Sequence, residues 1–174
     1  MRYVVLLRGI NLGPSRRIPM PRLREVLTDR GYGSVRTLIA SGNVVLDSEA
    51  AEDELARDLV TAIEEEFGLD VPVVVRSGEE LTAVLAEDPF GDVATDTSRY
   101  SVTFLPTVPD ADRVAALPPA QGGRYAVRGR ELYLWLPDGM GVSAMAKWPW
   151  DRLLGVAGTN RNWNTVTKLG ELAR

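Results

Sequence analysis

The sequence predicts an α/β (α+β) protein made of two ferredoxin-like halves of β-α-β-β-α-β type, packed into one compact unit, with an imperfect second half. The first observation behind this prediction is the order of strand and helix patterns, which is complete in residues 1–76 and recurs in part over residues 77–174. The second is that two of the strands are apolar on both faces, which indicates sheets that are covered on both sides. We therefore expect two halves, 1–76 and 77–174.

In the first half, each expected element has a local cause. YVVLLR at 3–8 is rich in β-branched and apolar residues on both alternating sets, which favours a buried strand. Pro19 and Pro21 suit the first turn of a helix, and Ser41-Gly42 suits a tight hairpin in which glycine takes a positive φ. Strands are expected at 3–8, 35–40, 43–47 and 71–75, and helices at 19–31 and 50–67.

The second half is expected to repeat this order without the final strand. ELYLWL at 131–136 alternates leucines with Tyr133 and Trp135, so this strand is also apolar on both faces. Strands are expected at 99–105, 123–127 and 131–136, and helices near 78–87, 110–117, 143–153 and 162–173.

Composition limits the possible chemistry. The 174 residues are 45% hydrophobic and 25% charged, and no apolar run is long enough to span a membrane, so we expect a cytoplasmic protein with no membrane partner. The chain has no Cys and no His. Thiol nucleophiles, histidine bases and Cys/His zinc sites are therefore excluded, and we expect neither a metal nor a cofactor.

Charge is distributed unevenly along the chain. Residues 1–40 carry eight Arg against two acidic residues, residues 41–120 carry four Arg against eighteen, and residues 121–174 carry eight basic residues against four. The asymmetry is compatible with two solvated acidic helices, and also with a basic site formed by the two ends of the chain.

The stretch TNRNWNT at 159–165 is the most unusual in the sequence, because it places three Asn and one Arg around a single Trp. It is expected to start the last helix, with Thr159 or Asn160 as N-cap and Trp163 facing the core. A helix N-terminus and an arginine together favour an anion. The alternative is that these side chains satisfy buried carbonyls and hold the last helix in place.

Two further polar segments lie near the ends of expected strands. RGINLG follows the first strand as a basic loop, but its spacing matches neither a P-loop nor a dinucleotide fingerprint. SGN at 41–43 is explained by hairpin geometry, although its side chains also suit a polar cleft. If the two ends of the chain converge, the anion-binding residues are Arg8, Asn11, Ser41, Asn43, Arg161, Asn162, Asn164 and Lys168.

Four stretches in this order, namely LLRGINLG with IPMPRLREVL, VRTLIASGNVVL, FGLDVPVVVRS and GTNRNWNTVTKL, resemble the bacterial family catalogued as domain of unknown function 1697. The resemblance extends over nearly the whole chain and implies two ferredoxin-like halves. It implies no activity, because that family is uncharacterised. The family pattern usually has an aromatic residue before its SGN turn, and Leu38 stands there instead, so no role is assigned to a ring at this position.

The sequence leaves three classes of function open. The preferred one is recognition of a small anionic or phosphorylated ligand by the Arg/Asn-rich residues, with phosphoryl hydrolysis without histidine as an enzymatic extension. The second is binding of single-stranded RNA, with Tyr133 and Trp135 as a stacking platform, although the net charge of -4 disfavours nucleic acid. The third is a non-catalytic structural or protein-protein module.

Overall fold

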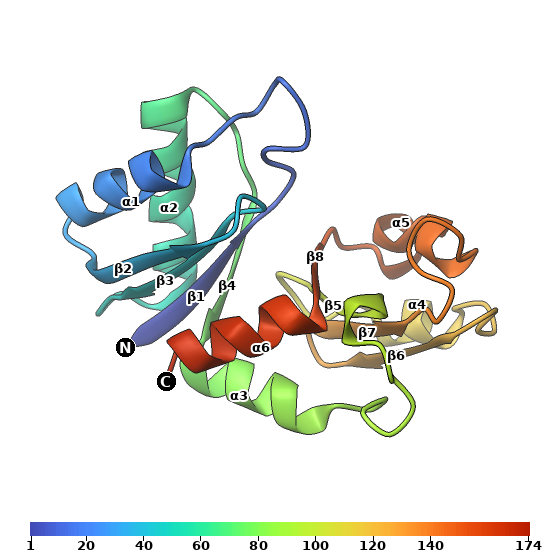
Figure 1. Cartoon of the computed structure of the whole chain (residues 1–174). Helices are drawn as coiled ribbons and strands as arrows, with labels where there is room; N and C mark the ends of the chain where they lie inside the picture. The colour runs from blue at the N-terminus through green and yellow to red at the C-terminus, as the bar shows by residue number, and fades with distance from the viewer. The chain divides into compact units, whose positions relative to one another are not determined.

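The computed structural model describes all 174 residues and divides into two compact units (Figure 1). Unit 1 comprises Met1–Ala83 together with Leu169–Arg174, and unit 2 comprises Val84–Lys168. The sequence-based boundary at 76/77 falls a few residues before this division. The proposal that the two halves form one compact unit stays a prediction.

Unit 1 is a complete ferredoxin-like plait, as predicted. Its antiparallel sheet has the order β2-β3-β1-β4, in which the first and third strands are neighbours at the centre. The helices α1 and α2 connect consecutive strands and lie on one face of the sheet (Figure 1). The elements are β1 (Arg2–Leu7), α1 (Met20–Asp29), β2 (Gly33–Leu38), β3 (Asn43–Asp47), α2 (Glu52–Phe67) and β4 (Val73–Ser77), followed by α3 (Gly78–Glu87).

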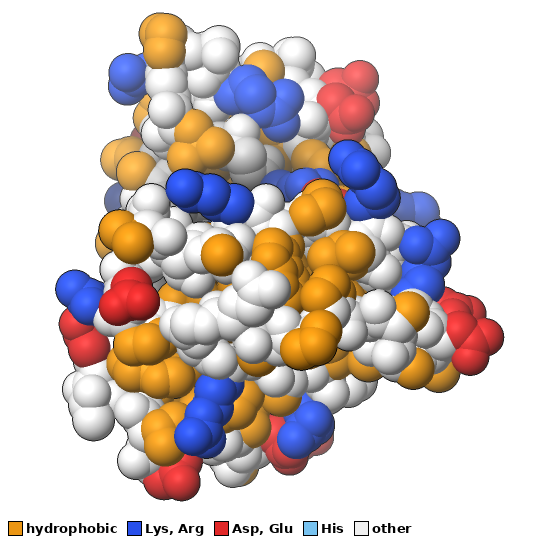
Figure 2. Space-filling view, turned by 90° about the vertical axis from the view of Figure 1, so that its right-hand side faces the viewer, with side chains coloured by type: hydrophobic (Ala, Val, Ile, Leu, Met, Phe, Trp, Pro, Cys, Tyr) orange, Lys and Arg blue, Asp and Glu red, His pale blue; other side chains and the backbone are white.

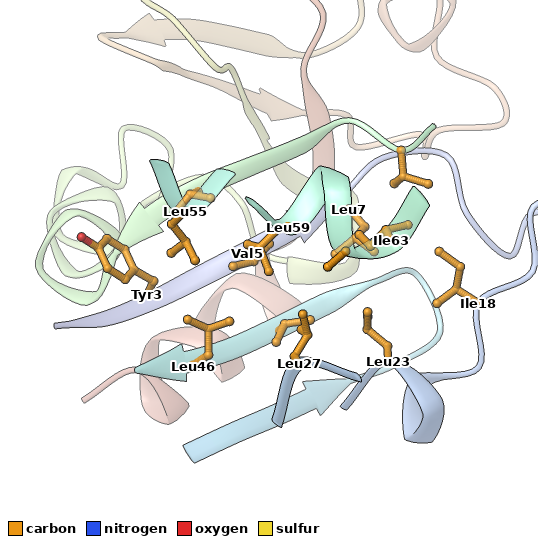
Figure 3. Packing of buried hydrophobic residues seen from close by; sticks show 14 of the residues in the cluster. Tyr3, Val5, Leu7, Ile18, Leu23, Leu27, Leu46, Leu55, Leu59 and Ile63 are labelled. Atoms are coloured by element: carbon orange, nitrogen blue, oxygen red, sulfur yellow. The ribbon is translucent and has the colours of Figure 1, made fainter. Parts of the chain in front are cut away.

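The core of unit 1 is aliphatic and lies between the sheet and its two helices. Alternation along β1 directs Tyr3, Val5 and Leu7 toward the helices, where they meet a stripe of leucines at helical spacing (Figure 3). Val4 and Leu6 on the opposite face are also at most 1% exposed. The prediction that β1 is buried on both of its faces is therefore confirmed.

Unit 2 has the same topology, and one expectation about it was wrong. The predicted absence of a final strand is contradicted by β8 (Thr159–Asn162), which pairs antiparallel with the central strand β5 (Tyr100–Phe104). The sheet order β6-β7-β5-β8 is thus the same arrangement as in unit 1. The other elements are η1 (Thr97–Arg99), α4 (Ala111–Ala115), β6 (Arg124–Arg128), β7 (Glu131–Trp135), η2 (Met145–Lys147), α5 (Trp150–Leu154) and α6 (Trp163–Leu172), of which the residues from Leu169 onward belong to unit 1.

The helices that connect the strands of unit 2 are much shorter than those of unit 1. The helix expected at 143–153 is instead a single 3₁₀ turn, η2, followed by the five-residue α5. Pro149 is the physical reason, because it lacks the N–H that a continuous helix would need at that position. The segment therefore covers its face of the sheet with side chains from loops and short turns rather than with one long helix.

The other face of the unit 2 sheet is aromatic and buried. Trp163 of α6 stacks on Tyr100 with ring centroids 4.5 Å apart, and the Tyr133 hydroxyl donates to the carbonyl of Val84. Tyr133 is 1% exposed and Trp135 is 8% exposed. These two rings therefore do not form the accessible base-stacking platform that an RNA-binding sheet needs. The apolar character of both strand faces is confirmed here as well.

The lengths and hydropathy of the helices were compared with what a membrane span requires. None of them is both long and apolar enough to cross a bilayer.

Candidate functional site

The segment TNRNWNT forms a strand followed by a helix, which changes where its side chains point. Residues 159–162 form β8, and α6 begins only at Trp163. Because side chains alternate along a strand, Asn160 projects to the face that carries α5, while Thr159 and Arg161 project to the opposite face with Val102. The expectation that this stretch starts the last helix, with Thr159 or Asn160 as N-cap, was wrong for this reason.

Asn160 joins the edge strand β8 to the central strand β5. Its amide Nδ2 donates to the hydroxyl of Ser101 at 2.9 Å and to the hydroxyl of Thr103 at 3.0 Å. Both amide protons are therefore used between the strands. The amide oxygen Oδ1 accepts no hydrogen bond from the chain, so an acceptor remains beside the Thr103 hydroxyl.

A cavity of about 460 Å³ lies over this polar pair. Thr103 and Asn160 contribute its polar groups, and the rings of Trp148 and Trp150 form part of its apolar lining. Met140, Leu134 and Ala146 add further apolar surface. An apolar cavity of this size with a few convergent polar groups is typical of a small-molecule site.

The two tryptophans are held in place by their neighbours. The Trp150 indole N–H donates to the carbonyl of Met145 at 2.8 Å, and Tyr125 packs edge-on against both indole rings. Trp148 and Trp150 have centroids 5.2 Å apart, so the rings touch and leave no space between them for a ligand. A ligand would instead lie against the cavity side of these rings.

The cavity also has charged residues. Asp151 and Arg152 are consecutive, exposed residues of α5 that line it. The Arg152 guanidinium makes no hydrogen bond or ion pair within the chain, whereas the Arg152 backbone carbonyl accepts from Arg113. Figure 2 views the molecule from the side on which α5 lies in Figure 1, and it shows hydrophobic side chains near the middle of this surface with Lys and Arg side chains around them.

Arg161 is a buried cation on the opposite face of β8. It is 7% exposed, and its Nη1 donates to the Thr159 hydroxyl at 2.7 Å and to the carbonyl of Asn160 at 2.9 Å. Burial lowers the pKa of its guanidinium to about 10, because removing the charged form from water disfavours it. Arg161 still carries its charge at neutral pH.

The other predicted ligand-binding residues of unit 2 are Asn162, Asn164 and Lys168. Asn162, rather than Thr159 or Asn160, caps α6, since its Oδ1 accepts from the backbone N–H of Thr165 at 2.9 Å. The Oδ1 of Asn164 accepts from the Thr97 hydroxyl at 2.7 Å. Lys168 is exposed on α6. Ligand binding by these residues stays a prediction.

Asn11 links two loops of unit 1. Its Nδ2 donates to the carbonyls of Ile18 and Ala40, at 2.9 and 2.7 Å, and its Oδ1 accepts from the N–H of Ile18 at 2.9 Å. The side-chain amide therefore has a bond for each donor and for its oxygen. Asn11 itself takes the left-handed conformation, with φ of 55°, which Asn tolerates better than most residues.

The SGN turn is held by a similar network. Asn43 is fully buried, and its Nδ2 donates to the carbonyl of Leu38 at 2.8 Å and to the Ser41 hydroxyl at 3.0 Å. Gly42 has φ of 93°, and an added Cβ would lie 2.7 Å from the Ile10 side chain, so conformation and space both require glycine. The backbone N–H of Arg8 donates to the carbonyl of Pro72.

Unit 1 therefore contains Arg8, Asn11, Ser41 and Asn43 of the predicted set, and unit 2 contains the other four residues. The hydrogen bond from Asn11 to Ala40 brings the RGIN loop and the SGN turn together within unit 1. No cluster of three acidic, His or Cys side chains in the chain is placed to hold a metal ion.

Sequence reasoning missed Trp148 and Trp150, because residues 143–153 were expected to form one continuous helix. The available signal was Pro149 between two tryptophans, which interrupts a helix and leaves large rings on an irregular segment. Asn160 was considered only as a helix cap.

Comparisons with known proteins agree with this architecture. Residues 1–133 match the family described as "Protein of unknown function (DUF1697)". A search of curated proteins found no match. Among solved structures, a conserved bacterial protein, SP0830 from Streptococcus pneumoniae, is similar with a TM-score of 0.79 and 24% identity, covering 99% of this chain and 98% of that one. This likeness shows a shared fold, and the chain belongs to the DUF1697 family of proteins of unknown function.

Proposed function

We propose that the protein recognises a small ligand that combines a planar or apolar part with an anionic group, and that the ligand binds in the cavity of unit 2. The observation that carries this proposal is the cavity of about 460 Å³ over Asn160 and Thr103, with Trp148 and Trp150 in its wall. Its size lies in the range of small-molecule sites.

Each part of the lining supports one feature of the ligand. The tryptophan rings favour a flat or apolar group, because contact between them removes apolar surface of both the ligand and the rings from water. The Asn160 oxygen is an acceptor and the Thr103 hydroxyl is a potential donor, so a polar edge would be recognised there. Arg152 provides a guanidinium suited to a carboxylate or a phosphate.

Binding without catalysis is the simplest form of this function. The chain has no His and no Cys, and the cavity lining contains one carboxylate, Asp151, and no Lys or Tyr. A paired general acid and base is therefore not assembled from the lining residues. Phosphoryl hydrolysis would require groups from outside this cavity.

The RGIN and RNWNT residues are proposed to act mainly in the fold. Asn11, Asn43, Asn162 and Asn164 all bond to other parts of their own unit. The alternative site for the ligand is an anion site formed by Arg8, Arg161 and Lys168. This alternative stays a prediction, and it is tested together with the cavity.

The test is a thermal-shift screen with nucleotides, sugar phosphates, aryl phosphates and aryl carboxylates. A ligand at 100 times its Kd is expected to add about 2.7 kcal/mol of stability, which is a readable shift. We expect at least one aryl phosphate, aryl carboxylate or nucleotide to stabilise the wild type. Ala146→Phe, which fills part of the cavity, should abolish that shift, and Arg152→Gln should reduce it.

Two controls locate the site. Arg24→Gln removes one exposed arginine from α1 in unit 1 and should leave the shift unchanged. Arg8→Ala/Arg161→Ala should also retain the shift if the variant folds. Loss of the shift in that double variant, with retention in Ala146→Phe, would contradict the cavity and support the arginine site. No stabilisation by any ligand class would contradict small-ligand recognition.

A further inference from the structure

We infer that unit 1 carries a docking surface for an acidic peptide segment with a bulky apolar side chain, at a surface formed by the RGIN loop and the SGN turn. We name this surface the loop tip. It comprises residues 11–20 and 39–42. The inference uses motifs that the proposed ligand cavity leaves without a functional role.

The hydrogen bonds of Asn11 hold the loop tip together. One side-chain amide donates to Ile18, in its own loop, and to Ala40, in the SGN turn. Because Leu12 follows Asn11 and Ile39 precedes Ala40, both apolar side chains extend from segments that this amide fixes. Leu12 is 86% exposed and Ile39 is 55% exposed.

Ile39 is held in a conformation that its side chain disfavours. Its φ of 51° lies in the left-handed region, where a β-branched residue is a genuine outlier. Such strain persists only where the surrounding structure imposes it. Since Ile39 is exposed, its own burial does not explain why an apolar, β-branched residue stands there. Contact with a partner would explain it.

The loop tip is also concave. A hollow of about 330 Å³ is lined by Asn11, Arg17, Ile18, Pro19, Met20 and Ala40. A hollow accepts an inserted side chain, as in peptide recognition by pockets. A membrane surface would instead be contacted by a convex wedge of apolar residues. The concavity therefore favours a peptide over a lipid bilayer.

Charge indicates the kind of peptide. Residues 8–24 and 33–46 contain no Asp and no Glu, and Arg17, which is exposed, lines the hollow. The loop also contacts Asp70, but through the backbone carbonyl that accepts from Arg16 Nη2. An occupant with carboxylates beside its apolar side chain would complement this surface, and association would be faster at low salt.

We test the docking surface by fluorescence anisotropy with two labelled peptides. Anionic vesicles serve as a separate lipid probe. The first peptide has two leucines between acidic triplets, and the second has the same leucines between lysine triplets. We expect the acidic peptide to bind at least about tenfold more tightly than the basic one, with weaker binding at higher salt. Vesicles of phosphatidylserine and phosphatidylcholine should not bind.

The variants separate the loop tip from other surfaces. Ile39→Asn removes the apolar group while placing a residue that tolerates a positive φ, so the protein should remain folded. We expect Ile39→Asn and Leu12→Ser each to weaken acidic-peptide binding about tenfold or more. Val142→Ser, at a side chain in unit 2 that is 72% exposed, should have no effect.

Three results would overturn the inference. These are equal binding of the two peptides, equal losses in Val142→Ser and Ile39→Asn, and binding of vesicles without binding of the acidic peptide. Ala146→Phe should leave peptide binding intact, which keeps this test independent of the ligand cavity.

Discussion

Units 1 and 2 share one topology but cover their sheets in different ways. In unit 1, the 10-residue α1 and the 16-residue α2 place an aliphatic stripe along the sheet. In unit 2, α4 and α5 have five residues each, and the same sheet face is covered partly by Tyr125, Trp148 and Trp150. A sheet with short connecting helices cannot be covered evenly, and the incomplete cover leaves the cavity beside Asn160.

The largest expected difference concerns the two cores. Leu59→Ala in α2 is expected to destabilise unit 1 by about 3–5 kcal/mol, because the surrounding helices and sheet cannot collapse onto the void. Leu154→Ala in α5, equally buried, should lower the stability of unit 2 by about 2–3 kcal/mol, since the loops around it can adjust.

All four Trp residues lie in unit 2, so urea unfolding followed by Trp fluorescence reports on that unit. Far-UV circular dichroism reports on both units. Equal losses of stability in Leu59→Ala and Leu154→Ala would mean that unit 2 is packed as tightly as unit 1. That result would contradict the expected difference between the two cores.

Arg161 should have the next largest effect. Arg161→Ala is expected to destabilise unit 2 by about 1–3 kcal/mol, because Thr159 and the Asn160 carbonyl lose a buried donor. Urea unfolding monitored by Trp fluorescence measures this loss. A neutral or stabilising result would instead support a ligand-binding role, since binding residues are often not optimal for stability.

The cap of α6 gives a smaller effect with a matched control. Asn162→Ala should lower stability by about 1 kcal/mol, because the N–H of Thr165 loses its acceptor. Asn162→Asp keeps the acceptor and adds a negative charge at a helix N-terminus, so it should be neutral or slightly stabilising. Both changes are measured from urea midpoints. Similar losses in both variants would show that the amide protons, rather than the cap oxygen, matter.

The smallest effect is the pH dependence of the α1–α2 contact in unit 1. The hydrogen bonds from Arg30 hold the pKa of Asp58 below its usual range, and Tyr32 donates to the same carboxylate. The contribution of Asp58 to stability is therefore present above the unfolded pKa of about 3.9, and it is lost as pH falls through the lower folded pKa.

Asp58→Asn should thus reduce the loss of stability between about pH 4 and pH 2, as measured by circular dichroism in urea. Acid unfolding that is unchanged in Asp58→Asn would contradict this assignment.

The fold could be predicted from local patterns because most strands and helices have strong periodicity. β8 could not, because TNRN has no apolar alternation and its strand pairing comes from hydrogen bonds to β5. Because a helix was expected where β8 lies, the sheet face to which the Asn160 side chain projects could not be predicted, since helical and extended backbones place consecutive side chains differently. The cavity depends on how α5 and η2 end around Pro149, and periodicity carries little information about such short elements.

The most direct test of the account is an NMR titration of the four tryptophan indole N–H signals with the ligands that stabilise the wild type. Trp148→Phe and Trp150→Phe assign the two cavity signals. We predict that the signals of Trp148 and Trp150 shift with ligand concentration, whereas those of Trp135 and Trp163, on the opposite face of the sheet, stay in place. Shifts restricted to Trp135 and Trp163, or none at saturating ligand, would contradict a binding cavity in unit 2.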